Sequence, residues 1–192
     1  MIAPPSPTLH GLRLRPVEPR DAPFIIAQRR HPRAVPFLGD TSPDVALQAD
    51  WIAAQRAKAH DAYWICENVA GTALGTIGIY NVDQATGEWG RFVVRPGSKA
   101  APGCLLLALT AAFDAMKLTD VVCTTVATNV RAIQFYERAG LICDPHYVGE
   151  VVLGGVPVAK VAHHVTTATW PQVQACLWAG AAAKAAEVAL EA

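Results

Sequence analysis

The segment 125–141, TVATNVRAIQFYERAGL, constrains the fold more than any other part of the chain. It continues a β-branched run that is typical of a buried strand. Asn129 then provides a helix N-cap, because its side-chain oxygen can accept a free N–H of the first helical turn. Gly140 suits the left-handed residue that follows a helix end. The segment therefore predicts a strand, a short helix and a defined stop.

Strand and helix patterns alternate along the rest of the chain. Strands are expected at 12–15, 63–68, 74–81, 88–94, 121–127, 142–153 and 156–165, and helices at 18–30, 43–59, 103–117 and directly after Asn129. Hairpins come first and a β-α-β-α unit follows, which predicts a mixed α/β (α+β) layer. We expect one domain over residues 1–168 and an Ala-rich helical tail over 169–192.

The composition restricts the partners and the compartment. The chain has 192 residues, of which 52% are apolar, and it carries 16 basic and 16 acidic residues. A nucleic-acid-binding surface would need a basic excess, so we expect no nucleic-acid partner. No apolar run is long enough to span a bilayer, and the N-terminus does not resemble a secretion signal. We therefore expect no membrane association and a cytoplasmic location.

The cysteines and histidines do not form a metal-binding or redox motif. The five cysteines lack a C-x-x-C spacing, and we expect them to be small buried residues in a reducing compartment. His163 and His164 are adjacent in a predicted strand, so their side chains point to opposite faces. We accordingly expect no metal site.

The motif N-x-x-A-x-x-F-Y-x-x-x-G, which runs from Asn129 to Gly140, resembles the C-terminal motif of the GNAT acyl-CoA N-acetyltransferases. The resemblance implies a mostly antiparallel central sheet of six or seven strands with helices on both faces, and acetyl-CoA as cosubstrate. It also implies that Asn129 lies beside the CoA arm and that Tyr136 lies near the thioester sulfur. A phenol there can protonate the thiolate as it leaves. The alternative is that Tyr136 is a core aromatic residue.

The segment 88–107, EWGRFVVRPGSKAAPGCLLL, predicts a strand, a loop of small residues and a helix N-terminus, which together can bind an anion. In GNAT proteins this loop reads R/Q-x-x-G-x-G/A and holds the CoA pyrophosphate. Ser98 and Ala101 depart from that pattern, Gly103 keeps it, and Lys99 could add charge. The alternative is a plain surface turn before a core helix. By resemblance, the CoA-binding residues are Phe92, Val93, Val94, Ser98, Lys99, Ala101, Gly103, Cys104 and Asn129.

Glu88 is the candidate general base. Strict alternation would place it on the same strand face as Gly90 and Phe92, with Arg91 on the other face. In several GNAT enzymes a Glu at this place takes a proton from the acceptor ammonium, which must be neutral to attack. Gly90 would leave open space in front of it. The alternative is a solvated carboxylate at the end of a strand.

The resemblance implies direct transfer of an acetyl group from acetyl-CoA to a primary amine. The phrase EWGRFVVRPGS also resembles GNAT members that accompany sugar-nucleotide or polysaccharide biosynthesis, which suggests an amino-sugar acceptor. A protein N-terminus, an amino acid, a polyamine and an antibiotic remain open as acceptors. We expect the acceptor pocket to come from residues 31–42 and 147–156 and their surroundings, which carry Arg33, Asp40, His146 and Glu150.

Two other readings remain open at this stage. The departures at Ser98 and Ala101 favour a non-catalytic module that binds acyl-CoA, and a protein N-terminal acetyltransferase would share the same motifs. The sequence also leaves open whether the chain forms a homodimer.

Overall fold

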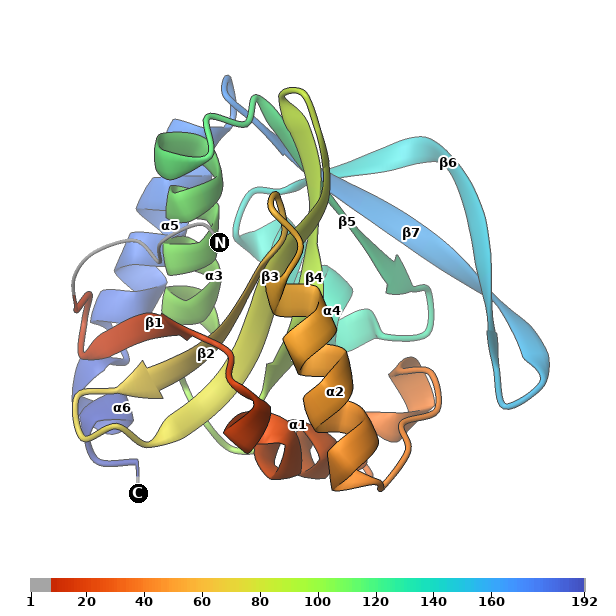
Figure 1. The fold of residues 1–192 in the computed structure, drawn as a ribbon. Helices are drawn as coiled ribbons and strands as arrows, with labels where there is room; N and C mark the ends of the chain where they lie inside the picture. The colour runs from red at the N-terminus through yellow and green to blue at the C-terminus, as the bar shows by residue number, and fades with distance from the viewer. Residues whose placement is uncertain (1–7, 192) are drawn as a thin grey trace.

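The computed structural model describes residues 8–191, which form one seven-stranded sheet flanked by helices (Figure 1). In chain order the elements are β1 (Leu12–Pro16), η1 (Pro19–Asp21), α1 (Ala22–Arg29), η2 (Val35–Phe37), α2 (Val45–Arg56), β2 (Ala62–Asn68), β3 (Ala73–Asp83), β4 (Thr86–Val94), α3 (Ala101–Thr110), η3 (Ala111–Ala115), β5 (Asp120–Val126), α4 (Val130–Arg138), β6 (Ile142–Leu153), β7 (Val156–Thr166), α5 (Trp170–Ala182) and α6 (Ala185–Ala189).

The strands lie in the order β1-β2-β3-β4-β5-β7-β6. β4 and β5 pair in parallel, and the other neighbouring strands pair antiparallel. Within residues 8–191, no helix is both long enough and apolar enough to cross a membrane. The predicted mixed layer, with a mostly antiparallel sheet of six or seven strands, is confirmed.

Helices cover both faces of the sheet, as predicted (Figure 1). On one face, α1 and α2 pack over a small core around Ile25, Ile52 and Ile65. On the other face, α3 and α5 pack over a larger core, to which Trp64 contributes. Because successive strand residues point to opposite faces, the neighbours Trp64 and Ile65 of β2 enter different cores. We call these the α1/α2 face and the α3/α5 face.

Several predicted local features differ from the structure. Pro43 does not begin α2, because Asp44 is its N-cap and its carboxylate accepts the amides of Ala46 at 2.8 Å and Leu47 at 3.2 Å. The helix expected at 103–117 begins at Ala101 and ends in the π-helical turn η3. Cys143 and Cys176 are exposed, so the expectation of five buried cysteines is wrong for these two.

The C-terminal helices pack on the α3/α5 face. Trp170 of α5 stacks on Phe113, with ring centroids 5.0 Å apart and an interplanar angle of 18°. A Cβ atom on Gly103 of α3 would overlap Leu12 of β1, so glycine lets the helix lie close to the strand. The buried amide of Asn68 donates hydrogen bonds to the carbonyl of Val188 at 3.3 Å and of Glu191 at 2.7 Å. These contacts tie the C-terminal segment to the end of β2.

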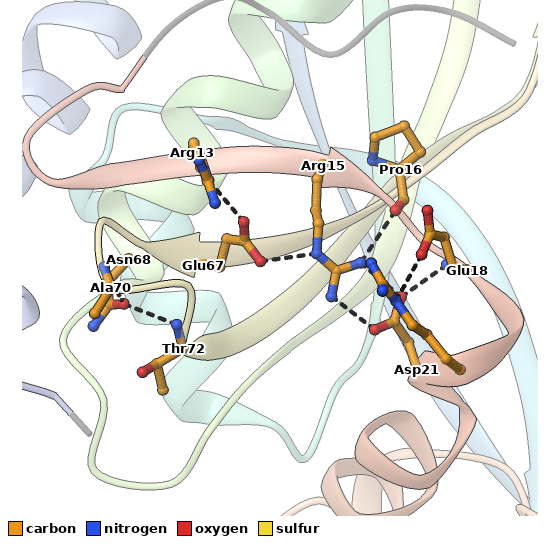
Figure 2. A network of polar contacts seen from close by, with 10 residues as sticks. Arg13, Arg15, Pro16, Glu18, Asp21, Glu67, Asn68, Ala70 and Thr72 are labelled. Carbon is orange, nitrogen blue, oxygen red and sulfur yellow. Dashed lines mark hydrogen bonds and ion pairs between the residues drawn. The ribbon is translucent and has the colours of Figure 1, made fainter.

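A network of ion pairs joins β1, β2 and η1 on the α1/α2 face (Figure 2). Arg15 donates to both carboxylate oxygens of Asp21, at 2.7 and 2.8 Å, and to Glu67 at 2.8 Å. Arg13 donates to the other oxygen of Glu67 at 2.7 Å. Burial alone would raise the pKa of Asp21, but hydrogen bonds from Arg15 and from the Glu18 amide outweigh it and lower that pKa. Each buried carboxylate in the network therefore has a cation beside it.

Candidate active site

A bulge in β4 sets the geometry of the site. Ile77 of β3 stands opposite two residues of β4, Arg91 and Phe92, and Arg91 has the left-handed φ of 51°. The extra residue changes which side chains share a face. Phe92 joins Trp89 against the α3/α5 core, whereas the Arg91 guanidinium lies over rings on the α1/α2 face.

Glu88 and Arg91 consequently lie on the same face, and the prediction that they lie on opposite faces is wrong. Glu88 stands opposite Tyr80 in the strand register, and the Cζ atom of Arg91 lies 4.4 Å from the centroid of the Tyr80 ring. Burial raises the pKa of Tyr80, and the charge of Glu88 raises it further. The predicted open space at Gly90 is also wrong, because a Cβ atom there would overlap the Tyr80 hydroxyl.

β4 and β5 separate just beyond this point. Their parallel pairing ends at Glu88 and Val122, although β5 continues beside β7 as far as Val126 (Figure 1). Beyond Glu88, β4 therefore pairs with β3 on one side and, within residues 8–191, has no strand partner on the other. The second halves of β4 and β5 thus diverge from one another.

Tyr136 of α4 packs against β4 near the point where the two strands diverge. The Asn129 side chain caps α4 as predicted by accepting the Ala132 amide at 3.3 Å, and Gly140 ends the helix with a φ of 89°. The Tyr136 ring is only 6% exposed and packs edge-on against Trp89 of β4, with centroids 4.9 Å apart. Burial raises the pKa of Tyr136, so the phenol keeps its proton at physiological pH.

His163 of β7 lies on the other side of Tyr136. Its ring is fully buried, and the two ring centroids are 5.6 Å apart. Among the residues that the structure describes, neither ring nitrogen has a hydrogen-bond partner. Burial lowers the pKa of His163, which keeps the imidazole neutral. The phenol of Tyr136 therefore lies among aromatic and uncharged groups.

The β4–α3 loop presents backbone amides at its end. Ser98 Oγ accepts the Ala100 amide at 3.1 Å, and the Lys99 amide donates to the Glu191 carboxylate at 2.8 Å. Pro102 removes one N–H from the first turn of α3, and the other amides of such a turn have no intrahelical partner. The Glu191 carboxylate thus already accepts a hydrogen bond from one amide of the loop, as an anionic ligand would.

The structure separates the predicted CoA-binding residues into two groups. Ser98, Lys99 and Ala101 lie on the loop or in the first helical turn, whereas Phe92 and Val94 pack against the α3/α5 core. Gly103 and Cys104 face that core too. The Cys104 amide donates to Ala100 at 2.9 Å, and burial together with neighbouring Cys66 raises the pKa of its thiol. Neither the amide nor the side chain of Cys104 is free to bind CoA. Val93 stands opposite Thr76 of β3.

A cavity of about 310 Å³ opens on the α1/α2 face. Its lining includes Asp40 from the 31–42 segment that was predicted to contribute, but not Arg33. The predicted 147–156 segment does not line it, because the β6–β7 hairpin projects away from α1 and α2 (Figure 1). The polar and aromatic side chains around the cavity are Arg29, Asp40, Thr41, Ser42, Gln48, Trp51, Tyr63 and Arg91.

Comparisons with known proteins identify the architecture. The family model of the acetyltransferase (GNAT) domain matches residues 11–142. The chain belongs to the GNAT acetyltransferase family. The solved structure of spermidine N-acetyltransferase from Vibrio cholerae, in complex with CoA and spermine, superposes with a TM-score of 0.75 at 16% identity, covering 84% of this chain and 98% of that one.

A second GNAT structure, apo FdhC, is described as a nucleotide-linked sugar GNAT. It superposes with a TM-score of 0.72 at 17% identity, covering 90% of this chain and 93% of that one. A search among curated proteins gives no match. At these identities the two structures establish the shared GNAT fold, while their acceptors differ from one another.

The surroundings of Arg91 in this GNAT protein were not foreseen from the sequence. Arg29, Trp51 and Tyr63 come from three different elements, and nothing in their local patterns links them to Arg91. Gly90 was the available signal, since an isolated glycine inside a strand often marks a bulge or a close approach. A bulge at that point would have predicted the change of face of Arg91.

Proposed function

We propose that this GNAT protein is an acetyl-CoA-dependent N-acetyltransferase that transfers acetyl directly to the primary amine of a small molecule. The observation that supports this most is the bulge of β4. It places Arg91 on the same face of the sheet as Glu88, the face of the cavity, while Trp89 and Phe92 of the same strand pack against Tyr136 and Phe135 of α4. One strand thus separates a donor side from an acceptor side, and holding both reactants there supplies proximity.

On the donor side, CoA is proposed to bind where β4 and β5 diverge, and its pyrophosphate to bind at the β4–α3 loop. Ser98, Lys99 and Ala101 would contribute there, and the Lys99 amide would become a donor to the pyrophosphate once the Glu191 carboxylate leaves it. Asn129 would lie beside the CoA arm at the start of α4. We expect no metal in this reaction.

Tyr136 is proposed as the proton donor to the departing CoA thiolate. Its raised pKa keeps the proton on the phenol until the sulfur develops charge. Its place between β4 and β7, against Trp89 and His163, gives it a fixed ring orientation.

On the acceptor side, Glu88 is proposed to receive the ammonium proton, directly or through water. A free primary amine has a pKa of about 10, so it is mostly protonated at neutral pH and needs such a group. The amine class remains a proposal, and an amino sugar is our first candidate because of the phrase EWGRFVVRPGS.

The proposal is tested by binding and by turnover. Acetyl-CoA should raise the melting temperature, because a ligand of the folded state stabilises it. Thiol release should then require an amine from a panel of amino sugars, amino acids, polyamines and peptides. Because Cys143 and Cys176 are exposed and would react with a thiol reagent, the assay should use the protein with both changed to Ser.

The outcomes separate the competing readings. Release with a small amine supports the proposal, and release only with peptide N-termini would instead show a protein N-terminal acetyltransferase. A raised melting temperature without release for any amine would show a module that binds acyl-CoA. No change in melting temperature would remove acetyl-CoA as the donor.

A further inference from the structure

Arg91 is held in place more firmly than most surface arginines. Its Nη2 atom donates to Gln55 of α2 at 3.0 Å. Its Cζ atom lies 4.4 Å from the Tyr80 ring centroid, 5.1 Å from that of Trp51 and 5.4 Å from that of Tyr63. The bulge fixes the backbone, and three rings with one amide side chain fix the guanidinium.

The charge of Arg91 is nevertheless uncompensated. Its Nη1 atom is buried and has no hydrogen-bond partner within residues 8–191. In the same part of the chain, no carboxylate lies within salt-bridge distance of Arg91, not even that of Asp40, which lines the same cavity. A half-buried cation without a carboxylate partner is costly, and an anion bound by the guanidinium would reduce that cost.

A second guanidinium lines the same cavity. Arg29 of α1 donates from Nε to the Thr41 hydroxyl at 2.8 Å, which orients the side chain and uses one of its five N–H groups. Two planar guanidinium groups match the paired oxygens of a carboxylate or a phosphate. The cavity, at about 310 Å³, has the size of a small-molecule site.

We propose that the acceptor amine also carries an anionic group, a carboxylate or a phosphate, which Arg91 binds together with Arg29. This inference rests on the proposed acetyl transfer and specifies its substrate class. Arg91 and Glu88 flank Tyr80, so an anion held at Arg91 places the rest of the molecule near the proposed base. A polycation such as spermidine would meet two like charges here and be disfavoured.

The test uses matched pairs of amines that differ in one anionic group. One arm compares amino acids with their neutral carboxamides, a second compares 2-amino-2-deoxy sugars with their 1-phosphates, and spermidine is included as the polycation. We expect the wild-type protein to prefer the anionic member by about tenfold to hundredfold in kcat/KM, as charged hydrogen bonds allow. The arm with the larger preference distinguishes carboxylate from phosphate.

Arg91→Met should remove this preference by raising KM for the anionic member while the neutral member is little changed. Arg33→Met is the matched control, because it removes the same charge from an exposed residue that does not line the cavity. It should keep the wild-type preference. An unchanged preference in Arg91→Met, or a wild-type preference for the neutral amines or for spermidine, would overturn the inference.

Binding without turnover separates this inference from the proposed function. Calorimetry in the presence of CoA should show tighter binding of the anionic members to the wild-type protein than to Arg91→Met, even if no amine is acetylated. Equal binding by both proteins would contradict the anionic acceptor whether or not thiol release occurs. Circular dichroism and melting curves confirm that Arg91→Met is folded.

Discussion

Two arginines on the α1/α2 face of the sheet experience opposite surroundings. Arg15 at the edge of the sheet makes three hydrogen bonds to the carboxylates of Asp21 and Glu67 (Figure 2). Arg91 in the middle of the sheet has three aromatic rings and the amide of Gln55 around it, with one buried nitrogen unpartnered. Both are charges held in place by neighbours, but only the first is neutralised by them.

The difference suggests a way to distinguish an arginine that stabilises the fold from one that binds a ligand. A guanidinium matched by carboxylates joins secondary-structure elements, and its loss should be measured as stability. A guanidinium fixed by rings and an amide keeps its attraction for an anion, and its loss should be measured in binding or rate. Substitutions of the two arginines and of their neighbours test that distinction.

Arg15→Met should have the largest effect. It leaves Asp21 and Glu67 buried with one cation fewer, which should lower the free energy of unfolding by about 3 kcal/mol. For a chain of this size that lowers the melting temperature by roughly 6–12 °C. Arg13→Met is the control, because the Arg13 side chain is 53% exposed and its loss should matter by about 1 kcal/mol or less. Equal losses of stability in the two variants would mean that the greater burial of Arg15 does not make its ion pairs stronger than that of Arg13.

Tyr136→Phe extends the comparison to a buried polar group on the opposite face. The ring keeps its contacts with Trp89 and His163, so stability should change little. If the phenol protonates the thiolate, kcat should fall by about 10²-fold, with CoA affinity retained. Lost stability with an unchanged kcat would instead identify Tyr136 as a core aromatic residue.

Glu88→Gln examines the acidic neighbour of Arg91. Near neutral pH we expect kcat/KM to fall by about tenfold, because most of the amine is then protonated. As the pH rises, neutral amine becomes available without help, so the variant should recover part of its deficit while the wild type gains less. Parallel pH–rate profiles for the two proteins would exclude Glu88 as the base. A deficit that grows with pH and appears in KM would assign it to binding the ammonium.

The stability that Asp21 and Arg15 contribute together should be lost at acid pH. The pKa of Asp21 is lowered in the folded state, so its contribution to stability is complete above the unfolded value of about 3.9. That contribution is lost as the pH falls through the lower folded pKa. Urea unfolding between pH 5 and 2 should therefore show a smaller loss in Arg15→Met than in the wild type. The same loss in both proteins would show that other carboxylates dominate.

Arg91→Met should have the smallest effect on stability. It gives up contacts with three rings and removes a half-buried cation that has no carboxylate partner within residues 8–191, so the free energy of unfolding should change by about 1 kcal/mol or less in either direction. The measurement is urea unfolding without ligand. A loss of stability as large as that of Arg15→Met would show that Arg91 is a structural residue like Arg15.

Local signals in the sequence predicted most of the fold. The cap at Asn129, the stop at Gly140 and the turn at 154–155 depend on neighbours in the chain, and the structure contains all three. Apolar and β-branched runs bounded by turn residues predicted the strands for the same reason. These features need no knowledge of distant contacts.

The site was harder to predict because its geometry depends on distant contacts. A single extra residue in β4 moves Arg91 to the face of Glu88, and alternation cannot reveal it. Gly103 matched a phosphate-loop position, yet its lack of a side chain is required by Leu12, 91 residues earlier in the sequence. The contact between Lys99 and Glu191 joins segments that no local pattern connects.

The packing of α5 determines when, during synthesis of the chain, the core on the α3/α5 face can finish folding. Trp170, Val173, Leu177 and Val188 belong to the same core as β1 and α3, and they emerge from the ribosome after every other part of that core. Until then the apolar surface of α3 and Phe113 has no cover on that side. Nascent chains stalled before α5 should therefore be held in an unfinished, chaperone-dependent state, and folding should complete only once α5 has left the exit tunnel.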